Sequence, residues 1–253
     1  MAQLGSLIRT LARRAGCDIR RYRPLVSDPY VVQRELLRTI PCSLIFDIGA
    51  FHGEAAAQYG QMFPAADIYA FEPFPPSYGA LAARFAGEKR IHVVNAAVSS
   101  QTGEATFHVN GLPETNSLLP RPTTGHQYFP TAAATEKKIS VPTTTVDEFC
   151  EKNKLGVPQI LKMDIQGNEL AALKGAEKAL ASGQISLIFS EVTFVPHYEG
   201  GVLFHELSAF LAGRGFTLLN LYEMHSASGV GQLRFGDAIY LSDKLRRDVI
   251  DRE

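Results

Sequence analysis

The chain has 253 residues, of which 45% are hydrophobic, 9% aromatic and 20% charged, an ordinary globular composition that excludes disordered, collagen-like and coiled-coil proteins. Its 25 basic and 26 acidic side chains give a net charge of −1, so the chain lacks the positive field of a general nucleic-acid binder, and we expect no nucleic-acid partner. The length fits one large domain with additions or two small domains.

Residues 1–24 form a basic amphipathic segment. They carry six arginines against one acid, Asp18, and Leu4, Leu7, Ile8 and Leu11 recur at the spacing of one helix face. Such a helix can lie on anionic lipid, but basic helix faces are usually just solvated. We therefore favour packing on the domain or against a second copy of the chain, with peripheral membrane contact as the alternative. Residues 1–40 are assigned to an N-terminal helical extension.

From residue 41 to residue 245, short apolar runs alternate with helical stretches. The expected strands are 43–47, 67–71, 91–95, 159–163, 185–189, 217–222 and 238–241, and the expected helices are 53–63, 75–85, 168–180 and 203–213. Continuously apolar strands that alternate with helices indicate a mostly parallel sheet covered on both faces. The predicted fold class is α/β, doubly wound.

One stretch breaks this alternation. Residues 103–109 have the pattern of an additional strand, and residues 110–135 contain four of the 14 prolines, Pro113, Pro120, Pro122 and Pro130. A structureless loop of this length inside a compact domain is usually a lid, a binding loop or disorder. We expect an inserted loop at 110–135.

Cysteine usage and hydropathy indicate a cytoplasmic protein. The three cysteines, Cys17, Cys42 and Cys150, are widely spaced without a C-x-x-C pair, which fits neither a disulfide framework nor a zinc site. No apolar run approaches the roughly 18 to 20 residues of a membrane span. Arginines also interrupt the N-terminal apolar residues where a secretion signal would need a continuous run. We expect a reducing compartment and no membrane span.

The first two expected strands end in residues that suit a nucleoside. Asp47, Gly49 and Gly53 form a D-x-G-x-x-x-G turn after the first strand. Glu72 ends the second strand about 20 residues beyond the turn, where doubly wound domains place the carboxylate that accepts hydrogen bonds from a ribose diol. The alternative is that the glycines only allow tight helix–strand packing and that Glu72 is a solvated acid.

The glycine spacing also indicates which kind of nucleoside-containing ligand the turn can bind. A dinucleotide needs G-x-G-x-x-G, but positions 51 and 52 are Phe51 and His52, and the chain has no phosphate-binding G-x-x-x-x-G-K-[ST] loop. A ligand with a ribose and no phosphate suits this turn better. S-adenosylmethionine is such a ligand, and Asp47 can help to hold its amino-acid end.

With these residues, the sequence resembles the FkbM-type family of S-adenosylmethionine-dependent O-methyltransferases from about residue 45 to residue 241. The resemblance rests on residues 46–53, 71–73, 95–99, 145–147, 161–169, 173–175 and 236–240. It implies a seven-stranded, Rossmann-like methyltransferase sheet whose last strand runs antiparallel, with S-adenosylmethionine as the cofactor.

The resemblance also implies roles for individual residues. They are Asp47, Gly49 and Gly53 along the methionine end of the cofactor, Glu72 at the ribose, and Asn95 and Ala96 at the edge of the adenine. The chain departs from the family at Gln166, where Glu is frequent, and near Phe51 and His52, where a small polar residue is usual. These departures concern substrate contacts more than the cofactor.

Acidic residues after the later strands are the catalytic candidates. Lys162 and Asp164 lie two residues apart on one strand, so they share a face that points toward the site. We expect Asp164 to orient the methionine amino group or the acceptor and to accept its proton, assisted by Glu191 at the end of the next strand or by His197. Glu169, in the first turn of a helix, is interpreted as structural.

Two further histidines and a metal ion are weaker candidates. His205 and His225 follow late strands, but no H-x-x-x-H or H-E-x-x-H spacing links the histidines. A Mg²⁺ ion held by Asp164 and Glu191 is the alternative to metal-free proton removal. Because nothing else lies at metal-ligand spacing, we expect no metal.

Together these observations predict methyl transfer from S-adenosylmethionine to a hydroxyl oxygen of a small molecule, sugar or glycan. We expect the 110–135 loop to close as a lid over the acceptor, with Asn116 and Ser117 as substrate-binding residues at its base. One alternative is a non-catalytic cofactor-binding module that acts through a partner surface at the basic N-terminus. A nicotinamide-dependent oxidoreductase is disfavoured by the glycine spacing.

Overall fold

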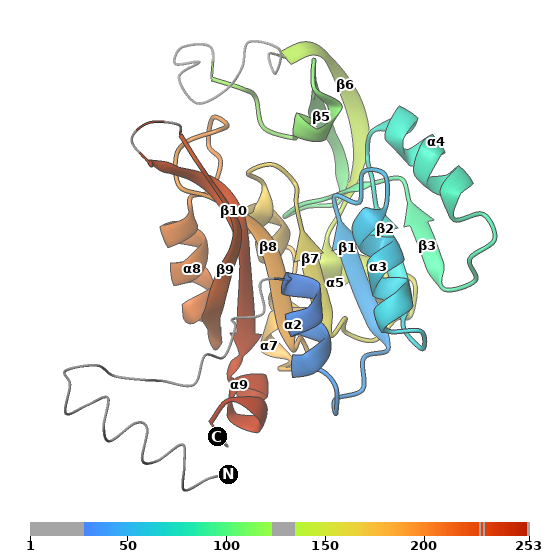
Figure 1. Cartoon of the computed structure of the whole chain (residues 1–253). Coiled ribbons are helices and arrows are strands. Elements are labelled where there is room, and N and C mark those ends of the chain that lie inside the picture. Colours follow the sequence, from blue (N-terminus) through green and yellow to red (C-terminus); the bar gives the residue numbers. More distant parts are fainter. Residues whose placement is uncertain (1–27, 123–134, 228, 230, 252–253) are drawn as a thin grey trace, which may run out of the picture.

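A computed structural model describes residues 28–122, 135–227, 229 and 231–251, and its centre is a seven-stranded sheet (Figure 1). The strands of this sheet are β1 (Leu44–Ile48), β2 (Asp67–Phe71), β3 (Ile91–Val94), β7 (Ile160–Met163), β8 (Leu187–Thr193), β9 (Phe216–Ser226) and β10 (Leu233–Ser242). They lie in the order β3-β2-β1-β7-β8-β10-β9. β10 runs antiparallel to β8 and β9, and the remaining neighbours pair in parallel. The doubly wound α/β class with an antiparallel closing strand is therefore confirmed.

Helices cover both faces of this sheet. The helices are α2 (Pro29–Leu36), α3 (Glu54–Met62), α4 (Pro75–Arg84), α5 (Val146–Lys152), α6 (Glu169–Lys174), α7 (Glu177–Ala181), α8 (Phe204–Ala212) and α9 (Asp243–Val249). Side chains alternate along β1, so Ile45 packs with α2, α3, α4 and α9 in one core, while Phe46 and Ile48 pack with α5 to α8 in the other. The central strands are buried on both faces, as their continuous apolar runs predict.

Strands on both sides of the predicted insertion build a second, smaller sheet. β4 (Ala97–Val98), β5 (Gly103–Asn110) and β6 (Thr135–Thr144) pair in the order β4-β6-β5, and a short 3-10 helix, η1 (Pro113–Thr115), follows β5. Phe107, Val109 and Val141 form its apolar core. This sheet stands beyond the carboxyl ends of β1 and β7 (Figure 1). β5 confirms the strand predicted at 103–109, whereas residues 123–134 of the predicted lid lie outside the described residues.

The helix predicted at 168–180 is two helices, α6 and α7. Gly175 lies against the chain after β4, where a Cβ atom would be 2.2 Å from the carbonyl oxygen of Ser99. The carboxylate of Asp147 accepts hydrogen bonds from the backbone N–H groups of Lys178 (2.8 Å) and Ala179 (2.9 Å) and starts the second helix. A close approach and a capping carboxylate from α5 therefore divide the predicted helix.

The ends of the chain also differ in detail from the predicted elements. Residues 1–27, which include the predicted basic helix, lie outside the described residues. Within the predicted extension, Leu36 and Leu37 at the end of α2 pack into the core of the domain, and α9 runs beyond residue 245. In the described parts of the chain, the helices are too short or too polar to span a bilayer.

Candidate functional site

The turn between β1 and α3 carries the first predicted residues of the site. Gly49 has a φ of +82°, and a Cβ atom there would lie 1.9 Å from the carbonyl oxygen of Asp164, so only glycine allows the chain after β1 to pass this close to the chain after β7. Phe51 also adopts a positive φ of 47°. Its N–H donates a 2.9 Å hydrogen bond to Glu72 Oε2. The turn is therefore bent toward the end of β2.

Glu72 is a buried carboxylate at the end of β2. Its second oxygen, Oε1, accepts a 2.9 Å hydrogen bond from the N–H of Phe74, and the Asn95 amide donates to the carbonyls of Glu72 (2.9 Å) and Pro73 (3.2 Å). Burial raises the pKa of Glu72 to about 7, although the two backbone N–H donors act in the opposite direction. Asn95 thus fixes the strand end that carries Glu72.

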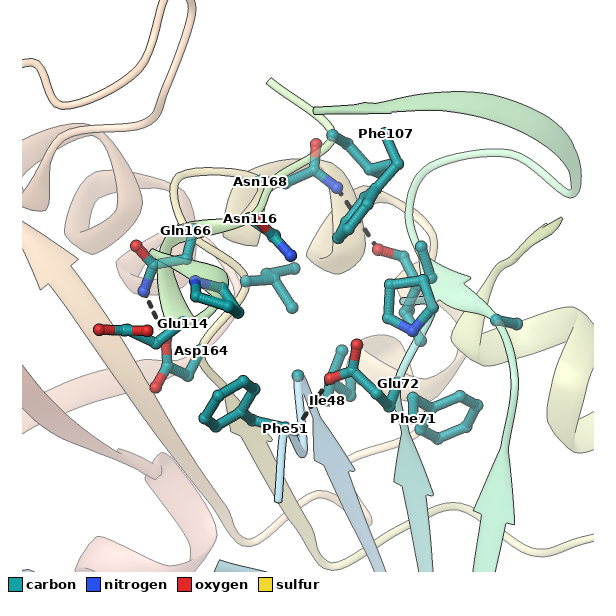
Figure 2. Close-up of a pocket in the computed structure, with 18 residues that line it drawn as sticks. Ile48, Phe51, Phe71, Glu72, Phe107, Glu114, Asn116, Asp164, Gln166 and Asn168 are labelled. Carbon is teal, nitrogen blue, oxygen red and sulfur yellow. Dashed lines mark hydrogen bonds between the residues drawn. The ribbon is translucent and has the colours of Figure 1, made fainter. Parts of the chain in front are cut away.

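The side chain of Glu72 lines a cavity beneath the second, smaller sheet (Figure 2). The cavity has a volume of about 120 Å³ and is open to solvent. It lies at the carboxyl ends of β1, β2 and β7, where ligands bind in open α/β sheets. Its lining is mostly apolar, with a few polar side chains. The lining residues are Ile48, Gly49, Phe51, Phe71, Glu72, Pro73, Ala96, Ala97, Val98, Phe107, Pro113, Glu114, Asn116, Leu118, Asp164, Ile165, Gln166 and Asn168.

Asn116 is a hydrogen-bond donor held in the roof of this cavity. Its Oδ1 accepts a 2.7 Å hydrogen bond from the N–H of Asn110, which fixes the orientation of the amide. The residue is 9% exposed, and its Nδ2 has no hydrogen-bond partner among the described residues. Figure 2 shows this nitrogen directed into the cavity. A buried donor without a partner costs free energy, so this one is suited to a ligand that accepts a hydrogen bond.

Ser117, the other residue predicted at the base of the lid, has a different environment. Its Oγ donates to the carbonyl of Gln166 (2.8 Å) and accepts from the N–H of Leu119 (3.0 Å). The side chain is 1% exposed and is not part of the cavity lining. Ser117 joins the segment after η1 to the turn after β7.

Asp164 and Glu191 converge at the edge of the cavity through a shared partner. The Nε2 of Gln166 lies 2.9 Å from Asp164 Oδ1 and 3.0 Å from Glu191 Oε2, so it donates one hydrogen to each carboxylate. The Asp164 side chain is 42% exposed, and Figure 2 shows it beside Gln166. Glu191 was predicted at the end of its strand. In the structure it lies inside β8, because the antiparallel pairing with β10 extends this strand to Thr193.

Glu191 faces Asp237 across this pairing. Burial raises the pKa of Glu191 well above its ordinary value, and the nearby carboxylates of Asp164, Glu169 and Asp237 act in the same direction. Burial, with Asp164 and Glu223, also raises the pKa of Asp237 to about 7. Asp237 therefore binds a proton more readily near neutral pH than an exposed aspartate does.

A second pocket lies beside the cavity and shares the lining residues Gly49, Phe51 and Asp164 with it. It continues toward Tyr30 on α2 and Asp237 on β10. Phe51 thus forms part of the wall of both spaces, a position that its glycine-flanked motif alone does not reveal.

Six predicted residues lie outside the cavity lining: Asp47, Gly53, Asn95, Ser117, Glu191 and His197. Asp47 is fully buried, with its Oδ1 3.1 Å from the Nζ of Lys162. A Cβ atom at Gly53 would meet the side chains of Leu81 and Phe85, which is the tight packing considered as the alternative. His197 is buried with its ring 5.7 Å from that of Phe235.

The three candidate histidines lie in different surroundings. Burial lowers the pKa of His197 to about 4, and the charges of Arg121 and Arg234 add to that effect. His225 stacks on Phe235 at 4.4 Å, and His205 is exposed on α8. None of the three histidines belongs to the described lining of the cavity.

The turn after β7 is held by Glu169. Its Oε1 accepts hydrogen bonds from the N–H groups of Ile165 (3.0 Å) and Gly167 (3.3 Å), and the side chain is 3% exposed. These contacts agree with the structural role predicted for Glu169. The residues described contain no group of three or more His, Cys, Asp or Glu side chains placed to hold a metal ion.

Sequence reasoning did not assign a role to Gln166 or Tyr198. Tyr198 Oη lies 2.8 Å from Gln166 Oε1 and 2.7 Å from the carbonyl oxygen of Thr115, so its single proton is shared between them. In the sequence, Gln166 was noted only as a position where the resembled family frequently has Glu, which gave no indication of the two carboxylates that Gln166 contacts.

Comparisons with known proteins agree with the predicted family. The family model of the methyltransferase FkbM domain matches residues 47–218. The chain is 26% identical over 176 residues to the 2-O-methyltransferase NoeI of Sinorhizobium fredii, covering 67% of this chain and 72% of that protein. It is 25% identical over 166 residues to the hexuronic acid methyltransferase AglP of Haloferax volcanii, covering 65% of this chain and 63% of that protein.

Solved structures show a more distant likeness. The magnesium protoporphyrin IX methyltransferase of Synechocystis PCC 6803, determined with bound S-adenosylmethionine, superposes with a TM-score of 0.47 at 12% identity. That alignment covers 84% of this chain and 76% of the other.

Proposed function

This chain belongs to the FkbM methyltransferase family and is an S-adenosylmethionine-dependent O-methyltransferase, and we propose that the hydroxyl group it methylates belongs to a sugar or glycan. One named relative supports this acceptor class, because it is called a hexuronic acid methyltransferase. The other, called a 2-O-methyltransferase, supports transfer to an oxygen. We place the reaction in the cytoplasm, in keeping with the free thiols of Cys42 and Cys150.

The observation that carries the assignment of the site is the buried carboxylate of Glu72 at the cavity wall. Two backbone N–H groups fix it, and each carboxylate oxygen has a further lone pair for a ribose hydroxyl. Pro73 and Ala96 supply apolar surface beside it for a flat base. The donors, acceptors and apolar walls of the cavity therefore fit an adenosine group.

When bound, the cofactor supplies a methyl group that is already activated on a sulfonium. The contribution left to the chain is to align the acceptor oxygen, which can account for roughly 7 to 11 kcal/mol of the barrier, and to remove its proton, for about 10²–10⁴-fold. We assign the removal of this proton to Asp164, whose partly exposed carboxylate borders the cavity, with Glu191 as its neighbour. His197 receives no part in this step because it lies outside the cavity lining.

Asn116 is the proposed contact to the acceptor. A sugar hydroxyl both donates and accepts hydrogen bonds, so it can accept one from Asn116 Nδ2 while it donates its proton toward Asp164. Both side chains line the same cavity, and within the described part of the chain no acceptor competes for the Nδ2. Ser117 is proposed to act indirectly, by holding the segment that carries Asn116.

The experiment that tests this function is mass spectrometry of the purified protein with methyl-labelled S-adenosylmethionine and a panel of acceptors. The panel contains neutral methyl glycosides, methyl glycosides of uronic acids, a catechol and a simple aliphatic alcohol. We expect the label on a carbohydrate hydroxyl. Transfer to the catechol or the alcohol without transfer to any glycoside would contradict the sugar assignment.

A further inference from the structure

Gln166 is a neutral side chain that lies between two carboxylates of the site. Its Nε2 is within 3.0 Å of oxygens from both Asp164 and Glu191, which come from neighbouring strands β7 and β8. An amide nitrogen carries two hydrogens, so it satisfies both carboxylates at once. Two acids that would otherwise repel each other are thereby held at a fixed separation by one donor group.

The orientation of this amide is determined by its surroundings. Carboxylates only accept hydrogen bonds, so the nitrogen must face them, and the Oε1 faces the Tyr198 hydroxyl at 2.8 Å. The backbone is held as well, since Gln166 has a φ of +56° and its carbonyl accepts a hydrogen bond from Ser117 Oγ. Arg121 lies over the Tyr198 ring at 4.2 Å. Backbone and side chain are both fixed.

We propose that Gln166 is a positioning residue, which sets the direction of the Asp164 and Glu191 carboxylates and favours their ionised forms by donating one hydrogen bond to each. This inference rests on the proposed role of Asp164 as the proton acceptor. A charged group that receives a hydrogen bond is stabilised in its charged form. Gln166 therefore helps to keep the acid beside the cavity able to accept a proton.

The other charged groups around this pair act in both directions. Lys162 Nζ lies 4.0 Å from Asp164 Oδ2. Glu169 from α6 and Asp237 from β10 oppose ionisation of Glu191, as burial does, whereas Gln166 favours it. Tyr198 and Arg121 complete the shell on the side of the loop after β8. Gln166 is the neutral donor that both carboxylates of this pair share.

Two substitutions separate positioning from mere packing. Gln166→Met keeps the length of the side chain and removes both donors, and Gln166→Glu adds a third carboxyl group in place of the donors. In both variants the ionised forms of Asp164 and Glu191 lose stabilisation, so their titrations should move to higher pH, by about one pH unit or more. Gln101→Glu, on an exposed loop of the described structure, is the matched control and should leave both titrations in place.

The primary measurement is an NMR titration of ¹³C-carboxyl-labelled Asp and Glu in the free protein, with Asp164→Asn and Glu191→Gln identifying the two signals. It needs neither cofactor nor acceptor. The second measurement is the pH profile of kcat with the glycoside that the acceptor panel identifies, whose acid limb should move in the same direction. Lower kcat with unmoved carboxyl titrations and an unmoved limb would mean that Gln166 only fills space, and would overturn the inference.

The outcomes also separate this inference from the proposed function. If Asp164→Asn keeps full turnover, the proton-acceptor role fails and the Gln166 inference, which rests on it, is overturned as well. If Asp164→Asn is inactive while the Gln166→Met titrations match the wild type, only the Gln166 inference fails. Thermal unfolding is followed for every variant, and Gln166→Met gives the same test if Gln166→Glu does not fold.

Discussion

The carboxylate of Asp47 lies 3.1 Å from the ammonium group of Lys162, its register partner on the neighbouring parallel strand. Asp47 is fully buried, and the Lys162 ammonium also donates to the carbonyl of Gly49 at 3.2 Å. Burial raises the pKa of Asp47, although the charge of Lys162 acts in the opposite direction. Burial alone would lower the pKa of Lys162, but the nearby carboxylates outweigh burial, so the pKa of Lys162 is raised. The pair joins β1 to β7 beneath the Gly49 turn and so supports the floor of the cavity.

Removal of the lysine from this pair should destabilise the fold strongly. Lys162→Met leaves the Asp47 charge buried without its partner, which typically costs about 3–5 kcal/mol. Urea unfolding should show this loss, with partial recovery in the double variant Asp47→Asn/Lys162→Met. Lys174→Met, at an exposed position on α6, is the control and should change stability by about 0.5 kcal/mol or less. Equal stabilities of the two single variants would contradict a structural role for the pair.

Glu72 should determine much of the affinity for the cofactor. Glu72→Gln keeps the size of the side chain but removes the charge that strengthens hydrogen bonds from the ribose. A hydrogen bond to a charged group contributes roughly 1.5 to 3 kcal/mol, so calorimetry should show S-adenosylmethionine binding at least about tenfold more weakly. Glu88→Gln, at an exposed position, should bind like the wild type. Unchanged affinity in Glu72→Gln would remove the ribose contact.

The same carboxylate should make cofactor binding depend on pH. Burial raises the pKa of Glu72 in the free protein to about 7, and ribose donors favour its ionised form. Affinity should therefore rise as the pH increases through about 7, and binding should release a proton. Calorimetry in buffers of different ionisation enthalpy measures that proton, and Glu72→Gln should flatten the pH dependence. A wild-type affinity that falls with rising pH would reverse the expected sign.

Asn116 should affect the acceptor and leave the cofactor unaffected. Asn116→Asp keeps the shape of the side chain but removes the unpaired Nδ2 donor, and a neutral hydrogen bond contributes about 0.5–1.5 kcal/mol. We expect the KM for a glycoside acceptor to rise about three- to tenfold while the Kd for S-adenosylmethionine stays the same. Asn153→Asp, at an exposed position, is the control. A raised cofactor Kd with unchanged acceptor KM would place Asn116 against the cofactor.

The strand ends of this sheet could be predicted where they depend on local pattern. β2 occupies the predicted residues 67–71, so Glu72 was correctly placed at the carboxyl edge. Glu191 was placed at a strand end because the apolar run that contains it does not reveal how far β10 pairs alongside. The burial of Asp47 depends on Lys162, more than a hundred residues away along the chain. Contacts across the sheet are therefore what the sequence pattern could not supply.

Asp164 should govern turnover, and its substitution separates two routes for the acceptor proton. The side chain borders the cavity, accepts from Gln166 Nε2 at 2.9 Å and is 42% exposed, so Asp164→Asn can be accommodated without a buried charge being left unpaired. If Asp164 accepts the proton, kcat should fall about 10²–10⁴-fold with little change in cofactor Kd. If it mainly holds the methionine amino group, the cofactor Kd should rise instead.

A chelator completes this last test. With proton transfer to a carboxylate alone, EDTA should leave wild-type turnover nearly unchanged, and added Mg²⁺ should not restore Asp164→Asn. A Mg²⁺ ion bound by Asp164 and Glu191 would instead lower the pKa of the acceptor hydroxyl, because a hard cation stabilises the oxyanion. Loss of wild-type turnover with EDTA that Mg²⁺ restores would therefore assign the activation of the hydroxyl to the metal and leave Asp164 as its ligand.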